Sequence, residues 1–456
     1  MSGGVHIPPA FFSRQEFQDK SFKTRASRQA LQDKRFKTSA SRQEFQNNIT
    51  TTAKNNKKGA SKMSIQILSP RIMEFGAGSS REIPHILAML GCSKPLIVTD
   101  IVMVGLGYAD SISQLLDNHR ISHDVFADTV SDPTVESIMA GVRKTCAGTD
   151  SLFPDAFDSI IALGGGSSID SAKAISILSQ FGGKIQDYKL PRNVNEQGLP
   201  IIAVPTTGTG AEVTPCTIIT DADAAEKMLC AGIGFSPVAV IIDSKFTRTV
   251  PSRIIADTGI DALTRAIESY VCQRANLYSD QQALAAMHLI NRNIRQAYYE
   301  PENNKAREAM ILGATLAGSA FSNTSGALIH GMSGTLSACF DVPHGMSNAM
   351  LLPTITEYSI SAAPSRYATC ARTMGVASQK DSDQAANAKL LNELKALNQE
   401  LKVPRLSEYG INKASFFERC YSMAEQALAS GAAGNNPRMP TKDEITELYE
   451  IVWQQK

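Results

Sequence analysis

Short apolar runs alternate with amphipathic stretches over the middle of the chain. The apolar runs are of the kind that is buried on both faces of a sheet. They lie at 96–100, 159–163, 200–204 and 238–243. Between them, segments such as 110–118 and 134–145 show the periodicity of helices with one apolar face. Alternation of this kind predicts a parallel, doubly wound α/β sheet.

After about residue 250 the pattern changes, and no comparable strand pattern follows. Apolar positions recur with helical spacing over 251–272, 277–299 and 305–322, and then on to the C-terminus with short breaks at glycine or proline. The sequence therefore predicts an α/β domain over 63–250 and an all-helical domain over 251–456.

Residues 1–62 form a different kind of polypeptide. They hold 13 Lys and Arg against 4 Asp and Glu, whereas the whole chain carries a net charge of only +1. A 14-residue repeat begins at Ser13 and again at Ser27, and a truncated copy begins at Ser41. Because so few apolar groups cannot offset the entropy lost on ordering, we expect this extension to be disordered.

Three interpretations of the extension stay open. Its arginines and serines suit an organellar transit peptide, but its four acidic residues fit that interpretation poorly. Its positive charge suits a tail that binds nucleic acid, although most basic tails are simply solvated. The third interpretation is upstream sequence translated ahead of a natural start at Met63.

Composition excludes several classes of protein. No apolar run approaches the roughly 20 residues that span a bilayer, so we expect no membrane partner. The eight cysteines form no C-x-x-C pair, which argues against a zinc ribbon or a disulfide framework. We expect a cytoplasmic protein with reduced cysteines.

Two loops at the carboxyl ends of predicted strands carry candidate cofactor-binding residues. The turn at 164–170 follows a strand and opens a helix, so backbone N–H groups face outward as a phosphate site requires, and Ser167 and Asp170 have capping-box spacing. The loop at 205–214 combines hydroxyls with glycines. Either loop alone is also typical of a tight turn without a ligand, but together they predict a dinucleotide site. The candidates are Gly165, Gly166, Ser167, Thr206, Thr207 and Thr209.

Asp100 closes the first predicted strand. A carboxylate at this position can accept hydrogen bonds from the ribose diol and repels a 2′-phosphate. It therefore favours NAD over NADP as the cofactor.

The motifs resemble those of the iron-containing (group III) alcohol dehydrogenase family, in particular its lactaldehyde reductase-like branch. The matching segments occur in order at 75–78, 98–100, 164–170, 205–207, 258–264, 331–333, 342–345 and 436–438. The resemblance implies a Rossmann-like nucleotide domain followed by a helical domain, the dehydroquinate synthase-like fold. It also implies NAD(P) in the cleft and a divalent metal, Fe²⁺ or Zn²⁺, held by one Asp and three His.

The resemblance assigns metal ligands to Asp261, His330 and His344. The family's remaining histidine falls four residues after Asp261, on the same helix face, where this chain has Arg265. One Asp and two His are a recognised facial set for Fe(II). A guanidinium about 5 Å from a divalent ion opposes binding by about 7 kcal/mol at an effective dielectric of about 20.

Further positions match the family or depart from it. The loop after Thr207 is one residue shorter than the family's Pro-Thr-Thr-X-Gly-Thr-Gly, and Gly334 stands where members often carry a proton-relaying histidine. Lys227 matches a lysine that contacts the cofactor ribose, and Asp132 stands where an asparagine often lies near the nicotinamide. We expect His288 to be a core or interface histidine.

The resemblance implies hydride transfer between nicotinamide and a small primary alcohol or diol, such as propanediol, in a homodimer or larger homo-oligomer. Asp261, Arg265, His330 and His344 are the candidate catalytic residues, and a bound metal would act as the Lewis acid. One alternative is a metal-independent enzyme, in which Arg265 supplies the positive charge in place of the metal. The other is an inactive relative that only binds nucleotide or has a structural role.

Overall fold

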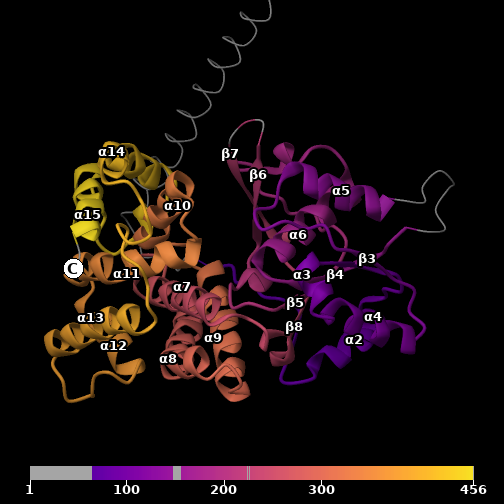
Figure 1. Cartoon of the computed structure of the whole chain (residues 1–456), viewed down its shortest axis with the longest axis horizontal. Coiled ribbons are helices and arrows are strands. Elements are labelled where there is room, and N and C mark those ends of the chain that lie inside the picture. The colour runs from indigo at the N-terminus through magenta and orange to yellow at the C-terminus, as the bar shows by residue number, and fades with distance from the viewer. Residues whose placement is uncertain (1–63, 147–155, 223, 225, 455–456) are drawn as a thin grey trace, which may run out of the picture. The chain divides into compact units, whose positions relative to one another are not determined.

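A six-stranded parallel sheet forms the centre of the first half of the chain in this computed structural model (Figure 1), which describes residues 64–454 except 147–155, 223 and 225. The predicted disorder of residues 1–62 lies outside the described residues. The strand order is β1-β8-β5-β4-β2-β3. The strands are β1 (Ile72–Phe75), β2 (Pro95–Val98), β3 (Asp124–Phe126), β4 (Ser159–Gly164), β5 (Ile201–Pro205) and β8 (Ala239–Ile242).

The four predicted strands correspond to β2, β4, β5 and β8, and every residue of these strands is buried. In β2, for example, Leu96 and Val98 belong to one apolar core and Ile97 belongs to another, on the opposite face of the sheet. Helices cover both faces, which confirms the doubly wound prediction. These helices are α2 (Ile83–Leu90), α3 (Ile101–Gly105), α4 (Tyr108–Asn118), α5 (Val135–Cys146) and α6 (Gly166–Phe181).

The sequence pattern missed the edge strands β1 and β3 and an antiparallel hairpin. The hairpin pairs β6 (Cys216–Asp221) with β7 (Glu226–Ala231). Its burial alternates along β6, with Thr217 and Ile219 buried and Ile218 exposed between them. Such half-exposed strands lack the continuous apolar run that marks a strand buried on both faces.

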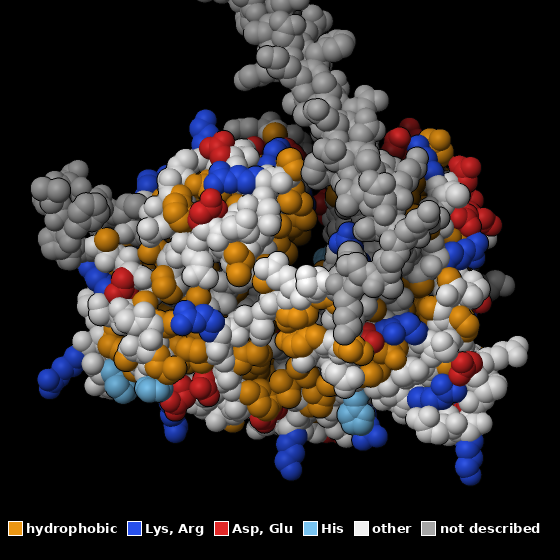
Figure 2. Space-filling view, turned by 180° about the vertical axis from the view of Figure 1, so that it is seen from behind, with side chains coloured by type: hydrophobic (Ala, Val, Ile, Leu, Met, Phe, Trp, Pro, Cys, Tyr) orange, Lys and Arg blue, Asp and Glu red, His pale blue; other side chains and the backbone are white. Residues whose placement is uncertain are grey.

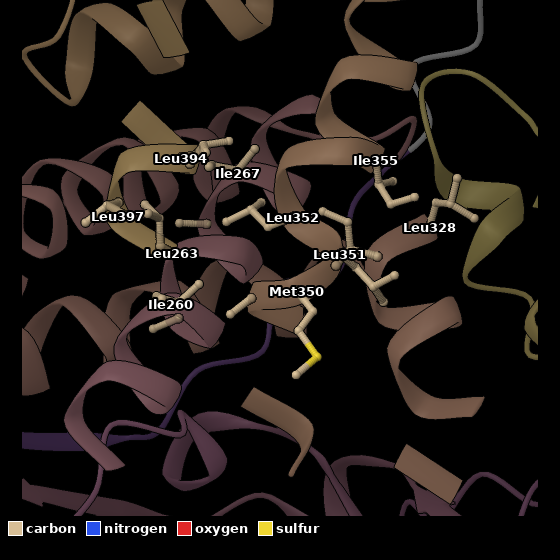
Figure 3. Close-up of a cluster of buried hydrophobic side chains, with 14 of the residues drawn as sticks. Ile260, Leu263, Ile267, Leu328, Met350, Leu351, Leu352, Ile355, Leu394 and Leu397 are labelled. Carbon is tan, nitrogen blue, oxygen red and sulfur yellow. The ribbon is translucent and has the colours of Figure 1, made fainter. Parts of the chain in front are cut away.

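The second half of the described chain is helical, as predicted. Its helices are α7 (Ser252–Val271), α8 (Leu277–Tyr299), α9 (Asn304–Ser322), α10 (Leu328–Phe340), α11 (His344–Ile360), α12 (Pro364–Thr373), α13 (Asp383–Glu400), α14 (Lys413–Ala429) and α15 (Lys442–Gln454). Figure 3 shows their core, where Leu263 and Ile267 of α7 lie near Leu352 of α11 and Leu394 of α13. Because α7 is buried along most of its length, its polar residues face other elements of the protein.

Short 3-10 helices connect these elements: η1 (Ser79–Glu82), η2 (Ile185–Tyr188), η3 (Ala211–Val213), η4 (Ile233–Phe235), η5 (Ser244–Thr247) and η6 (Ala433–Asn435). On the face shown in Figure 2, apolar side chains lie among charged side chains of both signs. Within the described ranges, no helix has the length and apolar character needed to cross a membrane.

Candidate functional site

The turn after β4 presents an uncapped helix N-terminus. Gly164 has φ +147°, and a Cβ on it would lie 2.6 Å from the Ser168 hydroxyl, so only glycine fits. No side chain caps α6 at its N-cap residue, Gly165. The predicted capping box is wrong, because Ser167 Oγ donates to the carbonyl of Ser131 instead. The first N–H groups of α6 therefore have no side-chain acceptor at the N-cap, as an anion site requires.

The threonine loop after β5 packs directly against this turn. A Cβ on Gly165 would lie 3.1 Å from Thr207 Oγ1, and one on Gly166 would lie 3.3 Å from Thr209 Oγ1. Thr206 is buried, and its Oγ1 has no hydrogen-bond partner. The structure thus brings five of the predicted cofactor residues together, and the glycines allow the hydroxyls to approach closely.

Asp100 lies at the carboxyl end of β2 and caps α3. Its Oδ1 accepts hydrogen bonds from the N–H groups of Val102 and Met103, at 2.9 and 3.0 Å. Its Oδ2 accepts one from Ser168 Oγ at 2.9 Å, which connects Asp100 to the first turn of α6. The sequence did not predict the capping role, and the ribose contact stays a prediction.

Lys227 and Asp132, which the sequence suggested separately, form an ion pair. Lys227 Nζ lies 3.3 Å from Asp132 Oδ1, and the two side chains are 47% and 73% exposed. Such an exposed pair contributes little to stability, so both groups remain free to serve a ligand. His288 is exposed on α8, so the expectation of a core histidine is wrong, and an interface role stays a prediction.

The three predicted metal ligands converge, although they come from three different helices. Asp261 lies in the middle of α7, His330 in the first turn of α10, and His344 at the start of α11. Asp261 Oδ1 lies 3.5 Å from His330 Nε2 and 3.8 Å from His344 Nε2. The three potential ligand atoms all lie within 4.8 Å of one another. Separations of this size suit ligands of one metal ion.

Glu268 orients one of these ligands. Its Oε2 lies 2.5 Å from His330 Nδ1, and its carboxylate also accepts the N–H groups of Ala327 and Ile329 at the start of α10. His330 Nε2, which faces Asp261, is buried and has no hydrogen-bond partner. A carboxylate on the other ring nitrogen is the usual support of a metal-bound histidine.

Glu268 is not among the residues that the sequence motifs predict for the site, although the sequence holds a usable signal. Glu268 follows Asp261 by seven residues, which is two helical turns, and so lies on the same face of α7. Burial lowers the pKa of His330, but the negative charges of Glu268 and Asp261 outweigh it and hold the pKa above its usual value.

Arg265 contacts the carboxylate oxygen of Asp261 that faces away from the two histidines. Its Nη2 lies 3.1 Å from Asp261 Oδ2, and its guanidinium lies 5.2 Å from the ring centroid of Phe321. Burial raises the pKa of Asp261, but Arg265 and the two histidines outweigh it and hold the pKa far below its usual value. Oδ1 faces the histidines and also accepts a 2.6 Å hydrogen bond from Asn348 Nδ2.

The donor set therefore fits a divalent metal on the Oδ1 side. The Nε2 of His330 is buried and makes no hydrogen bond, although Asp261 Oδ1 lies 3.5 Å away. This observation favours a ligand there, because a buried nitrogen without a hydrogen bond is costly. Arg265 contacts the other oxygen, so the carboxylate lies between the guanidinium and the candidate metal position.

The structure shows what surrounds two departures from the family pattern, Gly334 and the shortened loop after Thr207. A Cβ on Gly334 would meet no atom within 4 Å, so α10 offers no proton-relaying side chain there and has room for one. The shortened loop borders a cavity of about 40 Å³. Its lining includes Thr206, Thr207, Gly208, Thr258, Arg307 and Ala314.

Comparison with protein families gives two matches in succession. Residues 70–244 match the family described as "Iron-containing alcohol dehydrogenase", and residues 255–453 match "Fe-containing alcohol dehydrogenase family, C-terminal". Together they span the sheet and nearly all of the helical half.

Individual relatives agree with these matches. The chain is 32% identical over 389 residues to the NADPH-dependent butanol dehydrogenase of Clostridium saccharobutylicum. This match covers 84% of this chain and 97% of the relative. The chain is also 32% identical over 385 residues to the lactaldehyde reductase of Escherichia coli (strain K12), covering 83% and 97%. The structure of sulfoacetaldehyde reductase from Bifidobacterium kashiwanohense in complex with NAD+ superposes with a TM-score of 0.77 at 26% identity, covering 86% of this chain and 100% of that one.

Proposed function

We propose that this chain, which belongs to the iron-containing alcohol dehydrogenase family, transfers hydride between a small primary alcohol or diol and NAD. The observation that carries the proposal is the convergence of Asp261, His330 and His344, with the buried Nε2 of His330 making no hydrogen bond.

The cofactor residues have distinct roles in this proposal. The N–H groups at the start of α6 bind the pyrophosphate, because they carry the positive end of the helix dipole. The threonine hydroxyls beside them bind the nicotinamide half. Asp100 accepts the ribose hydroxyls, which disfavours the additional phosphate of NADP.

The residues around Asp261 hold the reacting groups. Asp261, His330 and His344 would hold the metal, which when bound supplies a Lewis acid that lowers the pKa of the substrate hydroxyl. Glu268 fixes the ring of His330, and Asn348 fixes the carboxylate of Asp261. Since Gly334 carries no side chain, the hydroxyl proton leaves through water.

The proposal is tested with purified, Fe(II)-loaded protein, NAD and 1,2-propanediol, by following NADH formation. His330→Ala is the test variant, and His288→Ala, which changes an exposed histidine on α8, is the matched control. We expect NADH formation by the wild type and the control and its loss in His330→Ala. Absence of activity in loaded wild type with every short alcohol tried would overturn the proposal.

The ion pair between Arg265 and Asp261 favours a second candidate function, a metal-independent enzyme or an inactive nucleotide-binding relative. In that case the guanidinium supplies the positive charge. Metal analysis decides between the two: tight binding of about one Fe(II) or Zn(II) per chain supports the first function. No binding, with either metal-free activity or none at all, supports the second.

A further inference from the structure

Arg265 uses few of the hydrogen-bond donors that an arginine offers. A guanidinium has five N–H groups. Among the described residues, Arg265 makes one polar contact, from Nη2 to Asp261 Oδ2. Its Nε is buried and has no hydrogen-bond partner. A buried charged donor without an acceptor is costly, so this group is suited to an acceptor that a ligand supplies.

Other arginines of the helical half are better satisfied. Arg307 donates to three backbone carbonyls, Arg366 to one carbonyl and one carboxylate, and Arg295 to two carboxylates. These side chains join segments of the fold. An unpartnered Nε also occurs in Arg253 and Arg372, but those side chains donate to backbone carbonyls as well, whereas the polar contact of Arg265 within the described ranges is with a single carboxylate.

The position of Arg265 is next to the reacting groups. It shares the carboxylate of Asp261 with His330 and His344. The side chain of His344 is 45% exposed and that of Arg265 is 14% exposed, so solvent reaches the site mainly from the His344 side. The ring centroid of Phe321 lies 5.2 Å from the guanidinium carbon and 4.6 Å from the ring centroid of His330. The aromatic ring therefore offers the guanidinium a cation–π contact.

We propose that Arg265 binds an oxyanion group of the substrate, so that the enzyme acts preferentially on short hydroxy acids and the matching aldehyde acids. This inference rests on the proposed function. In the oxidative direction the carbinol C–H bond breaks and its hydride, with two electrons, passes to the nicotinamide ring of NAD+. The hydroxyl proton goes to water, giving the aldehyde acid, NADH and H+.

Geometry and chemistry define the substrate class. A planar guanidinium pairs with a carboxylate or sulfonate through two parallel hydrogen bonds, and it does so better than a lysine. Because Arg265 and the histidines approach the two oxygens of one carboxylate, a substrate that reaches both must be short. One structural relative is named a sulfoacetaldehyde reductase, and sulfoacetaldehyde is an aldehyde that bears an oxyanion.

The test compares two substrates of equal length, 3-hydroxypropanoate and 1,3-propanediol, with the loaded enzyme and NAD+. We expect kcat/KM to be about tenfold or more higher for the acid, mainly through KM, and Arg265→Met to reduce this ratio by about 10- to 100-fold. Arg265→Lys should keep part of the preference. A parallel series with isethionate distinguishes a sulfonate site from a carboxylate site.

The matched control is Arg253→Met, since Arg253 also lies on α7 and also pairs with an aspartate four residues away, Asp257. It should leave the ratio unchanged. An unchanged ratio in Arg265→Met would overturn the inference while leaving the proposed function intact.

A binding measurement separates this inference from the proposed function. Malonate, which cannot be oxidised, should bind the complex of wild type with NAD+ in calorimetry and bind about tenfold or more weakly to Arg265→Met. If the wild type oxidises neither substrate, the proposed function fails, and malonate binding still tests Arg265. Equal malonate affinity in the wild type and Arg265→Met contradicts the anchoring role.

Discussion

The carboxylate of Glu268 holds the imidazole of His330 at 2.5 Å while it also accepts two N–H groups at the start of α10. One buried side chain of α7 thereby sets both the position of α10 and the orientation of the ring that α10 carries. His330 presents its other nitrogen to Asp261 as a result of this contact.

Replacement of Glu268 by glutamine should weaken metal binding. The amide keeps the shape of the side chain but loses the charge that supports the ring, and loss of such outer partners costs about 10- to 100-fold in metal affinity. Competition with a fluorescent chelator measures this affinity directly. Asp257→Asn, on the same helix, should leave the affinity within about twofold of wild type. Equal affinity for Glu268→Gln and wild type would show that the contact does not orient a ligand.

Conversion of Arg265 to histidine should raise metal affinity. The substitution removes a positive charge 3.1 Å from the Asp261 carboxylate and supplies an imidazole on the same face of α7. We expect tighter Fe(II) or Zn(II) binding in the same competition assay. If the enzyme is instead metal-independent, the variant loses its metal-free activity, and unchanged metal affinity would contradict the assignment of the centre.

Asp100→Asn separates charge from capping. Asparagine caps a helix about as well as aspartate, so the N–H groups of Val102 and Met103 keep their acceptor and the melting temperature should stay nearly the same. We expect the wild type to bind NAD about tenfold or more tightly than NADP and the variant to lose most of this preference. Titration of both cofactors checks it. A wild type without preference would remove Asp100 from the cofactor site.

Thr206→Val tests the unpartnered hydroxyl beside the cofactor loop. Because Thr206 Oγ1 is buried and makes no hydrogen bond, its removal should not lower the melting temperature of the free protein. If the hydroxyl contacts NAD, affinity should fall by about 3- to 10-fold. The matched control is Thr315→Val, which removes a 2.6 Å hydrogen bond to Glu212 and should lower the melting temperature. A clear loss of stability in Thr206→Val would mean that the hydroxyl supports the fold.

The central strands were predictable because burial on both faces forces a continuous apolar run, as in Leu96 and Ile97 of β2. The β6–β7 hairpin was missed because its strands are only half buried. Exposed Ile218 lies beside buried Ile219, and no continuous apolar run marks the strand. The helical half was predictable because its apolar positions recur with helical spacing over long segments.

Within the site, local sequence was a weaker guide than tertiary contacts. Asp261 and His330 were assigned through family resemblance, since 69 positions separate them in the chain and only the packing of α7 against α10 brings them together. Ser167 was expected to cap its own helix, but the carbonyl of Ser131 competes for its hydroxyl, and no local pattern reveals that competitor. A glutamate on a helix is usually exposed, so the sequence pattern alone does not single out Glu268.

The divided carboxylate of Asp261 has a thermodynamic consequence. One oxygen faces Arg265 and the other faces the two histidines, so a ligand that draws the guanidinium toward itself leaves more negative charge for a cation on the other side. Linkage makes this effect reciprocal. An anion bound to Arg265 must raise the affinity for the cation by the same factor by which the cation raises the affinity for the anion. Substrate and metal would then bind with positive cooperativity through a single side chain, without movement of either domain.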